Sequence, residues 1–134
     1  MQRQYIQPAG WQTPPGYSQA VTTTGGPLLV VSGQVPFDPS GAIVGLGDFE
    51  AQAAQCFENL RTVLAAGGAS FSDVIKLTYF IVGISKERML AVRAVRDRYL
   101  PESGRPASSA IGVAGLFSDE VLIEIEAIAE LPKP

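Results

Sequence analysis

The sequence predicts an α+β domain with a mixed β-sheet and two helices packed on one face. Two segments with apolar residues at helical spacing alternate with five β-prone segments, in the order strand, strand, helix, strand, helix, strand, strand. The chain has 134 residues, of which 46% are hydrophobic, enough for one core without disulfides. We therefore expect residues 1–134 to form a single domain.

The first part of the chain predicts a β-hairpin after an irregular arm. Residues 8–16 contain three prolines and two glycines, a composition that disfavours a helix. Residues 17–24 and 27–33 are rich in β-branched and aliphatic side chains, and a glycine pair separates them. Two β-prone segments around such a pair are typical of a hairpin. A turn-rich connection over residues 36–47 follows.

Two helices are predicted in the middle of the chain. Asp48 and Ser85 suit their N-termini, because a short side-chain oxygen accepts an unpaired backbone N–H there. Gly67 is expected to end the first helix in the left-handed conformation, and Pro101 to stop the second. The expected buried residues are Phe49, Ala53, Cys56, Phe57, Leu60, Val63 and Leu64 in the first helix, and Met89, Val92, Val95 and Tyr99 in the second.

Three further strands are predicted over residues 75–82, 106–113 and 121–130. Alternate side chains of a strand lie on opposite faces of the sheet. In the first of these strands, one face is expected to carry Ile75, Leu77, Tyr79 and Ile81. In the last, one face carries Val121, Ile123, Ile125 and Ala127, and the other carries Leu122, Glu124, Glu126 and Ile128.

The composition excludes several classes of function. The chain has no histidine, which excludes Ser-His-Asp triads and His-ligated metals, and we expect no metal or cofactor. Scattered basic residues and a pI of about 4.9 argue against a nucleic-acid partner. The apolar segments fall short of the roughly 18 residues of a membrane span, and the polar N-terminus does not resemble a signal peptide. A cytoplasmic protein is expected.

The low charge predicts self-association. Charged residues make up 17% of the chain, against roughly 25% in an average soluble domain. A small domain has much surface and, here, few charges to cover it, so we expect a homo-oligomer. Clefts between subunits would bind a small molecule and would be lined by one or two acids of the uncovered sheet face.

Several side chains could carry chemistry. The carboxylates of Glu124 and Glu126 lie about 7 Å apart by strand geometry. They form either a solvated pair or one salt-bridged between subunits, or a site where one acid has a raised pKa and transfers a proton. Cys56 falls on the apolar stripe of the first helix and is interpreted as a small buried hydrophobe rather than a nucleophile. Tyr17 is either a residue that packs against its neighbours or a proton donor. Ser32 and Gly33 either simply end a strand or expose their backbone amides to a ligand.

Four segments together resemble the Rid family (RidA/YjgF type). They are Tyr17-Ser-Gln-Ala-Val, Val31-Ser-Gly-Gln-Val-Pro36, the helix from Gln52 to Leu60, and Ile123-Glu-Ile-Glu-Ala-Ile-Ala129. The resemblance implies a chorismate-mutase-like fold, assembled as a homotrimer with three inter-subunit clefts. It also implies metal-free hydrolysis of reactive enamines and imines to carbonyl compounds and ammonia.

The resemblance extends to only part of the cleft. Tyr17, Ser32, Gly33 and Glu124 match cleft positions of the deaminase pattern, in which Glu124 and Tyr17 would be catalytic and Ser32 and Gly33 would bind substrate. Ser108 stands where that pattern has the arginine that grips the substrate carboxylate. Ala110 replaces a cysteine or small polar residue, and Arg93 replaces a helix asparagine. Ser108, Ala110 and Arg93 are therefore further candidate substrate-binding residues.

The missing arginine divides the functional hypotheses. Loss of a bidentate contact should weaken binding of a 2-imino acid by about ten- to a hundredfold. Arg93 and Arg105 could each supply the charge, although Arg105 should point to the opposite face from Ser108. One hypothesis is therefore an enzyme acting on imines without the usual carboxylate, and the other is a trimeric small-molecule-binding or regulatory module. A ribonuclease fits the charge poorly.

Overall fold

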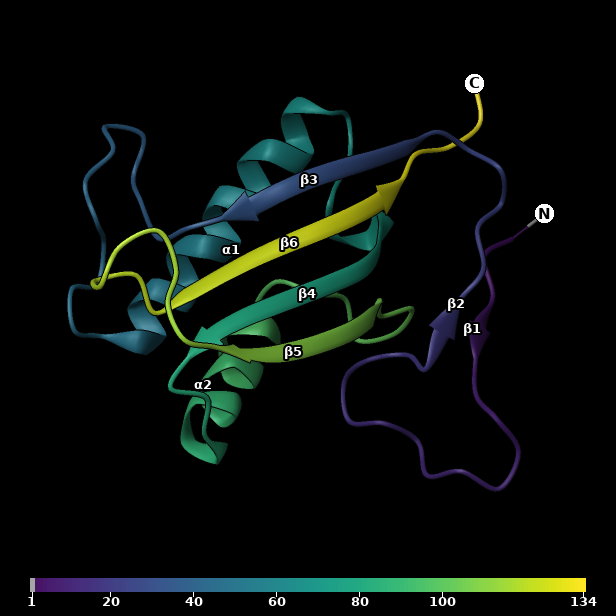
Figure 1. Ribbon diagram of the computed structural model, residues 1–134. Coiled ribbons are helices and arrows are strands. Elements are labelled where there is room, and N and C mark those ends of the chain that lie inside the picture. The colour runs from purple at the N-terminus through teal and green to yellow at the C-terminus, as the bar shows by residue number, and fades with distance from the viewer. Residues whose placement is uncertain (1) are drawn as a thin grey trace.

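A four-stranded sheet and two helices form the main body of the computed structural model, which describes residues 2–134. The strand order is β3 (Leu28–Gln34), β6 (Ile123–Glu130), β4 (Val74–Val82) and β5 (Ala107–Val113). β4 and β5 are parallel, and the other neighbours are antiparallel. The predicted mixed sheet is therefore confirmed (Figure 1).

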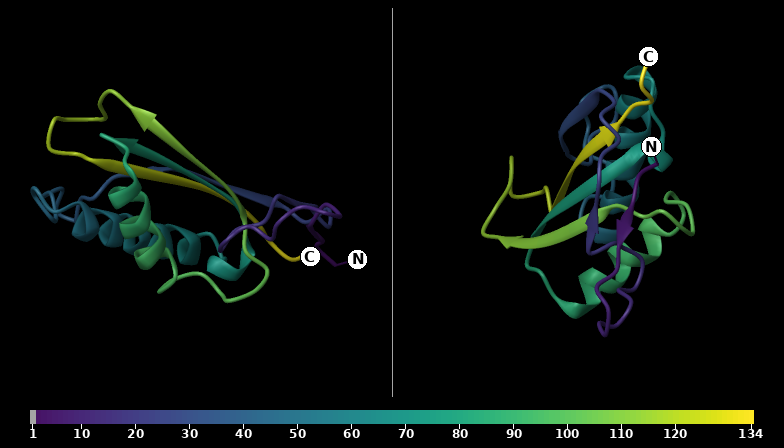
Figure 2. Two further views of the ribbon diagram at one scale, coloured as in Figure 1. Left: turned by 90° about the horizontal axis from the view of Figure 1, so that it is seen from below. Right: turned by 90° about the vertical axis from the view of Figure 1, so that its right-hand side faces the viewer.

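Both helices lie on the same side of this sheet, as predicted (Figure 2). Helix α1 spans Phe49–Ala66 and helix α2 spans Lys86–Arg96, while a 3-10 turn, η1, at Phe71–Asp73 leads into β4. The side chain of Asp48 accepts the N–H of residue 51, and Ser85 accepts that of residue 88. The two N-cap predictions are therefore confirmed.

The hydrophobic core fills the space between the helices and the sheet. The ring of Phe57 on α1 lies at its centre and stacks on Tyr99, with 5.1 Å between centroids. Tyr99 is partly buried as expected, although α2 ends three residues before it. The large side chains that are fully buried include Phe57, Leu60, Leu64, Leu77, Ile81, Ile123, Ile125, Val74, Val92 and Val95.

The predicted register at the start of the β4 strand is wrong by one residue. The pairing of β4 with β6 shifts between Val74 and Lys76, so Ile75 is the extra residue of an irregularity. Val74 consequently takes the buried position that the alternating pattern assigned to Ile75. Sequence alternation cannot reveal such a shift, because it depends on the partner strand.

The predicted hairpin between residues 17–24 and 27–33 is not formed. Ala20–Val21 (β2) pairs instead with Tyr5–Ile6 (β1) in a separate two-stranded ribbon. β3 takes β6 as its neighbour, more than 90 residues later in the chain. Local β-propensity identified the segments, but the long-range partners decided the pairing.

Glu130 organises the glycine turn that was expected to join the hairpin. Its buried carboxylate accepts the N–H groups of Thr24 and Gly25 at 2.7 and 3.1 Å, and Nε of Arg3 at 3.3 Å. Burial raises the pKa of this carboxyl, but the hydrogen bonds outweigh that effect, and the pKa of Glu130 is lowered overall. The acid therefore ties the N-terminal arm to the end of β6.

The left-handed residue after α1 is Gly68, with φ of +82°, and not Gly67, whose φ is −88°. Gly67 is required for a different reason. A Cβ at this position would lie 2.5 Å from a methyl carbon of Leu29 on β3. The first glycine thus permits close packing of α1 on the sheet, and the second reverses the chain.

The sheet face that the helices leave uncovered carries exposed apolar side chains. Val30 is 72% exposed, Leu28 is 54% exposed and Ile111 is 43% exposed. Together they make the kind of apolar face that a soluble protein usually covers. Within residues 2–134, no helix has the length and apolar character needed to cross a membrane.

We expect Glu130→Gln to lower the free energy of unfolding at neutral pH, because a neutral amide accepts the three hydrogen bonds less strongly. The folded-state pKa lies below the ordinary value of 4.5. Ionised Glu130 therefore stabilises the fold above about pH 4.5, and its contribution is lost as pH falls through the folded-state pKa.

Urea unfolding of wild type and variant across this pH range measures the effect. The difference between them should shrink on acidification. The exposed carboxylate of Glu120 supplies the control variant Glu120→Gln, which should match wild type at each pH. An unchanged stability difference at acid pH would contradict this role of Glu130.

Candidate functional site

An irregularity at the end of β3 seats the Glu124 carboxylate. Between Val31 and Gln34, β3 takes one residue more than β6 does, which makes a bulge of Ser32 and Gly33. A Cβ on Gly33 would stand only 2.1 Å from Oε2 of Glu124. The carboxylate therefore lies against the Gly33 backbone, and a larger residue there would displace it. Gly33 and Glu124 are thus brought together, with exposed Ser32 beside them.

Glu124 and Glu126 both lie on the uncovered face of the sheet. They are half-buried and stand opposite Phe80 and Thr78 of β4. Within residues 2–134, neither carboxylate forms an ion pair with a basic side chain. An ion pair with another copy of the chain, one of the alternatives left open by the sequence, stays a prediction.

Two amide side chains of α1 hold the loops on either side of Glu124. Asn59 donates hydrogen bonds of 2.9 and 2.8 Å to two carbonyls in the loop after β3. Fully buried Gln52 donates to the carbonyl of Glu120 at 2.9 Å and accepts the N–H of Leu122 at 2.8 Å, just before β6. The hydrophobic pattern missed these positioning residues, although both lie in the helix segment that carries the family resemblance.

Ser108 and Ala110 lie on the edge strand β5, on the face that the helices cover. In the parallel register they stand opposite Leu77 and Tyr79, whose side chains are in the core. Ser109, between them, faces the other way, and its hydroxyl accepts a hydrogen bond of 2.8 Å from the β4 lysine. Within one chain, these two candidates are therefore separated from the acidic site by the sheet itself.

Tyr17 is brought to the same sheet edge as Ser108. The N–H of Ser18 donates to the carbonyl of Pro106 at 3.0 Å, and its hydroxyl donates to that of Arg105 at 2.6 Å. Ser18 also bridges the first residue of β5 in parallel fashion. The backbone at Tyr17 thus runs beside the beginning of β5, far from its own Glu124 in the strand order.

The structure distinguishes the two arginines that the sequence left as alternatives. Arg105 donates to Asp97 at 2.6 Å and to the carbonyl of Pro101 at 2.8 Å. Arg96 contacts the same carboxylate at 3.1 Å. The hydrogen bond from Arg105, aided by Arg96, lowers the pKa of Asp97. Arg105 is therefore engaged internally, whereas half-buried Arg93 has no ion-pair partner within residues 2–134.

Two buried side chains have altered proton affinities. Cys56 is fully buried beside the carbonyl of Ile123, and burial raises the pKa of its thiol, which confirms it as a small core residue. Tyr79 is also buried, and burial raises the pKa of its phenol. Within the described chain, its hydroxyl is the one buried side-chain polar atom without a hydrogen-bond partner. Sequence alternation placed Tyr79 in the core but gave no sign of this unpaired group.

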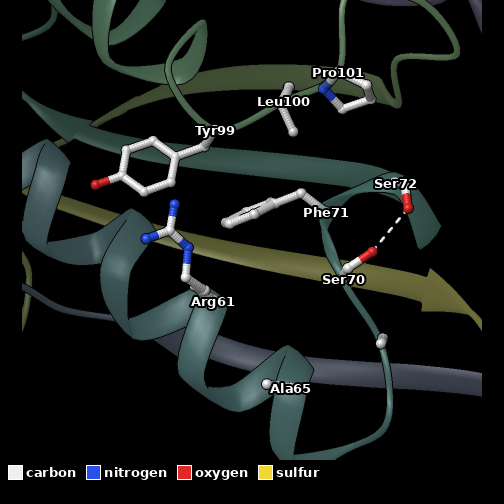
Figure 3. Close-up of a pocket in the computed structure, with 9 residues that line it drawn as sticks. Arg61, Ala65, Ser70, Phe71, Ser72, Tyr99, Leu100 and Pro101 are labelled. Atoms are coloured by element: carbon white, nitrogen blue, oxygen red, sulfur yellow. Dashed lines mark hydrogen bonds between the residues drawn. The ribbon is translucent and has the colours of Figure 1, made fainter.

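A cavity of about 440 Å³ lies on the helix side, between α1 and the segment that follows α2. Figure 3 shows the Arg61 guanidinium over the Tyr99 ring, 4.8 Å from its centroid, and the hydroxyls of Ser70 and Ser72 joined by a 2.8 Å hydrogen bond. Arg61 also pairs with Glu58 at 3.0 Å. Because its polar groups are already partnered and none is a predicted site residue, this cavity is not the candidate site.

Comparison with known proteins places the chain in a family. The family model described as Endoribonuclease L-PSP matches residues 11–131. The crystal structure of YyfB from Yersinia pestis, described as a conserved Rid-family protein of unknown function, is 36% identical, with a TM-score of 0.84 over 98% of this chain and 100% of the other. The chain belongs to the Rid family.

Characterised and uncharacterised relatives share this similarity. A RutC family protein of Synechocystis is 37% identical over 98% of this chain and 99% of its own length. The 2-iminobutanoate/2-iminopropanoate deaminase of Salmonella typhimurium is 37% identical, over 78% of this chain and 80% of its own.

We expect Gly33→Ala to displace the Glu124 carboxylate of this Rid protein, because the added methyl overlaps it, with only a small loss of stability since this half-buried side chain can move aside. Gly115→Ala is the matched control, since a Cβ there meets no atom within 4 Å and no positive φ is required. Urea unfolding at a fixed protein concentration measures both. A crystal structure of Gly33→Ala should show Glu124 displaced, and an unmoved carboxylate with wild-type stability would contradict the assignment.

Proposed function

We propose that the protein hydrolyses reactive enamine or imine metabolites to carbonyl compounds and ammonia. The observation that carries this proposal is the Glu124 carboxylate, which rests on Gly33 at the uncovered sheet face without a basic partner in the described chain. Membership of a family that includes an iminobutanoate deaminase supports the reaction class. The site requires no metal ion in this proposal, because water and one acid suffice for the chemistry.

The active cleft in this proposal lies between copies of the chain, in a homotrimer. Glu124 is on the uncovered face, whereas Ser108 and Ala110 are on the covered face of the edge strand, two strands away. Strands are about 4.8 Å apart, so one small molecule cannot contact both groups of the same chain. Glu124, Ser32 and Gly33 of one copy would meet the edge near Tyr17 of the next. The exposed apolar sheet face supplies the surface that this assembly buries.

Hydrolysis then proceeds through a tetrahedral intermediate. Glu124 accepts a proton from water as the water oxygen bonds to the imine carbon, and the C=N electron pair moves to nitrogen. Glu124 then gives this proton to the nitrogen, where Tyr17 donates a hydrogen bond, and a carbinolamine with one O–H and one NH2 group results. Glu124 next accepts the O–H proton and passes it to the nitrogen, the C–N bond breaks, ammonia leaves, and the C–O bond becomes the carbonyl. An enamine follows the same course after it gains a proton at carbon.

The substrate is expected to differ from a short 2-imino acid. Ser108 offers one neutral hydrogen bond and cannot balance a carboxylate, and Arg105 is held by Asp97. Backbone amides near Ser32, Gly33 and Ala110 remain available for polar substrate atoms. We therefore expect imines without a carboxylate beside the reacting carbon to be preferred.

A non-catalytic binding or regulatory module is the second candidate. The observation that favours it is Ser108, which stands where the deaminase pattern has an arginine. Without that positive charge, the cleft would suit a neutral ligand that is bound and not hydrolysed. Ligand binding in calorimetry without ammonia release from any imine would support this module over the enzyme. RNA cleavage is the weakest alternative, because the pI of about 4.9 opposes binding of a polyanion.

Replacing Glu124 by Gln should reduce ammonia release from an enzymatically generated neutral imine by about 10²- to 10⁴-fold, because the amide cannot carry the proton. Glu126→Gln is the matched control, since it alters a carboxylate on the same strand and face. Coupled assay of ammonia measures the rate. Equal losses in the two variants, or none in either, would contradict the role of Glu124.

Mixed oligomers test whether the cleft is shared. Glu124→Gln and Tyr17→Phe chains are each expected to be impaired alone. Random mixing should restore active clefts at about a quarter of the positions, since an intact Glu124 and an intact Tyr17 then come from different copies. Sedimentation should give three times the 14.2 kDa chain mass. A monomer, or mixtures no more active than their parents, would contradict the shared cleft.

Ser108→Arg should increase kcat/KM for 2-iminobutanoate by about ten- to a hundredfold, because a guanidinium forms a charge-assisted contact with the carboxylate. The same variant should leave the rate with a neutral imine nearly unchanged. Ser103→Arg is the control, since Ser103 is exposed and lies outside β5. Fast hydrolysis of 2-iminobutanoate by the wild type would contradict the assigned role of Ser108.

A further inference from the structure

A charged cavity of about 460 Å³ lies beside the candidate cleft, at the beginning of β5. It is a shallow hollow, widely open to solvent, bordered by the second half of α2, the end of the N-terminal arm and the segment before β5. Its volume is in the range of small-molecule sites. The lining residues are Pro15, Gly16, Arg93, Arg96, Asp97, Glu102 and Arg105.

Most of the charge in this cavity is already neutralised within the protein. Asp97 binds the guanidinium groups of both Arg96 and Arg105. Glu102 contributes a second carboxylate at the exposed rim. Three arginines against two acids leave one net positive charge. Because Arg93 forms no ion pair with any residue from 2 to 134, that charge is available at its side chain.

Gly16 connects this cavity to the cleft. A Cβ on Gly16 would lie 2.3 Å from the Arg96 guanidinium and 3.0 Å from that of Arg105, so the arm passes directly over both groups. The next residue is Tyr17, which the proposed function places in the cleft. A ligand that extends from the cleft past Tyr17 would therefore arrive at the cavity that Arg93 lines.

The spacing along β5 determines how far the anionic group of such a ligand must lie from its reacting carbon. Arg105, in the cavity wall, precedes Ser108 by three residues, which is about 10 Å in an extended chain. The carboxylate of a 2-imino acid is bonded to the reacting carbon and cannot cover this distance. An anionic group several atoms away can do so with the help of the long Arg93 side chain.

We propose that Arg93 is a specificity-determining residue that binds the carboxylate of an imine substrate whose carboxylate is remote from the reacting carbon. The inference rests on the proposed function and names its substrate class. A single net positive charge matches a carboxylate better than a doubly charged phosphate. The planar guanidinium also offers two parallel N–H donors to the two carboxylate oxygens.

Calorimetric binding of stable ketones tests the proposal without requiring turnover. The probes are 5-oxohexanoate, with a remote carboxylate, 2-oxobutanoate, with an adjacent one, and hexan-2-one, which has none. Inorganic phosphate tests for general anion binding. The variants are Arg93→Gln and Arg93→Lys, with Arg98→Gln as the matched control, because Arg98 is exposed, pairs with Glu50 at 2.8 Å and is outside the cavity lining.

Wild type should bind 5-oxohexanoate at least tenfold more tightly than the other probes. Arg93→Gln should lose about ten- to a hundredfold in this affinity, Arg93→Lys should lose less, and Arg98→Gln should match wild type. Equal binding by wild type and Arg93→Gln, a preference for 2-oxobutanoate or phosphate, or no binding of 5-oxohexanoate would overturn the proposal.

Ammonia release from a neutral imine separates this inference from the proposed function. If the protein hydrolyses a neutral imine but binds 5-oxohexanoate independently of Arg93, the proposed substrate class is wrong and the proposed reaction stands. If binding depends on Arg93 but no imine is hydrolysed, including one with a remote carboxylate, the proposed reaction is wrong and the proposed ligand site stands.

Discussion

The contact between the Gly33 backbone and the Glu124 carboxylate determines how the chain presents its chemistry. It exists because residue 33 has no side chain, since a Cβ there would lie 2.1 Å from Oε2 of Glu124. Ser32 and Gly33 lie where β3 takes one residue more than β6. The half-buried carboxylate therefore lies against the backbone of a strand at the uncovered face. The helix amides of Gln52 and Asn59 then hold the two flanking loops, so the position of the acid depends on the core helix as well as on the sheet.

The same sheet keeps the two halves of the candidate cleft apart. Glu124 occupies one face and Ser108 with Ala110 the opposite face, so that no rotation of side chains within one chain brings them together. An apolar face with Val30 and Leu28 exposed adjoins the acidic half. In the proposed homotrimer, the same association buries this apolar surface and completes the cleft. The stability of the assembly and the activity of the cleft would therefore depend on each other.

The N-terminal arm has a comparable double role. It is tied at one point by the buried carboxylate of Glu130 and at another by the guanidinium groups that contact Gly16. Between these points, Ser18 joins the beginning of β5. An arm that local propensity describes as irregular thus reaches the sheet edge with Tyr17 in a defined place. Arg105 is paired with Asp97 beside this arm, whereas Arg93 forms no ion pair within residues 2–134.

Residue pattern alone determined the two helices, their N-caps, the mixed sheet and the identity of the Rid family, because these depend on local spacing and on short motifs. It also marked Glu124, Gly33 and Tyr17 as candidates. Only the tertiary structure decided the pairing of β2 with β1, the shift at Ile75, the bulge at Ser32 and Gly33, and the ion pair between Arg105 and Asp97. Each depends on a partner distant in the chain, and backbone ladders and ion pairs are satisfied between such partners rather than along the sequence.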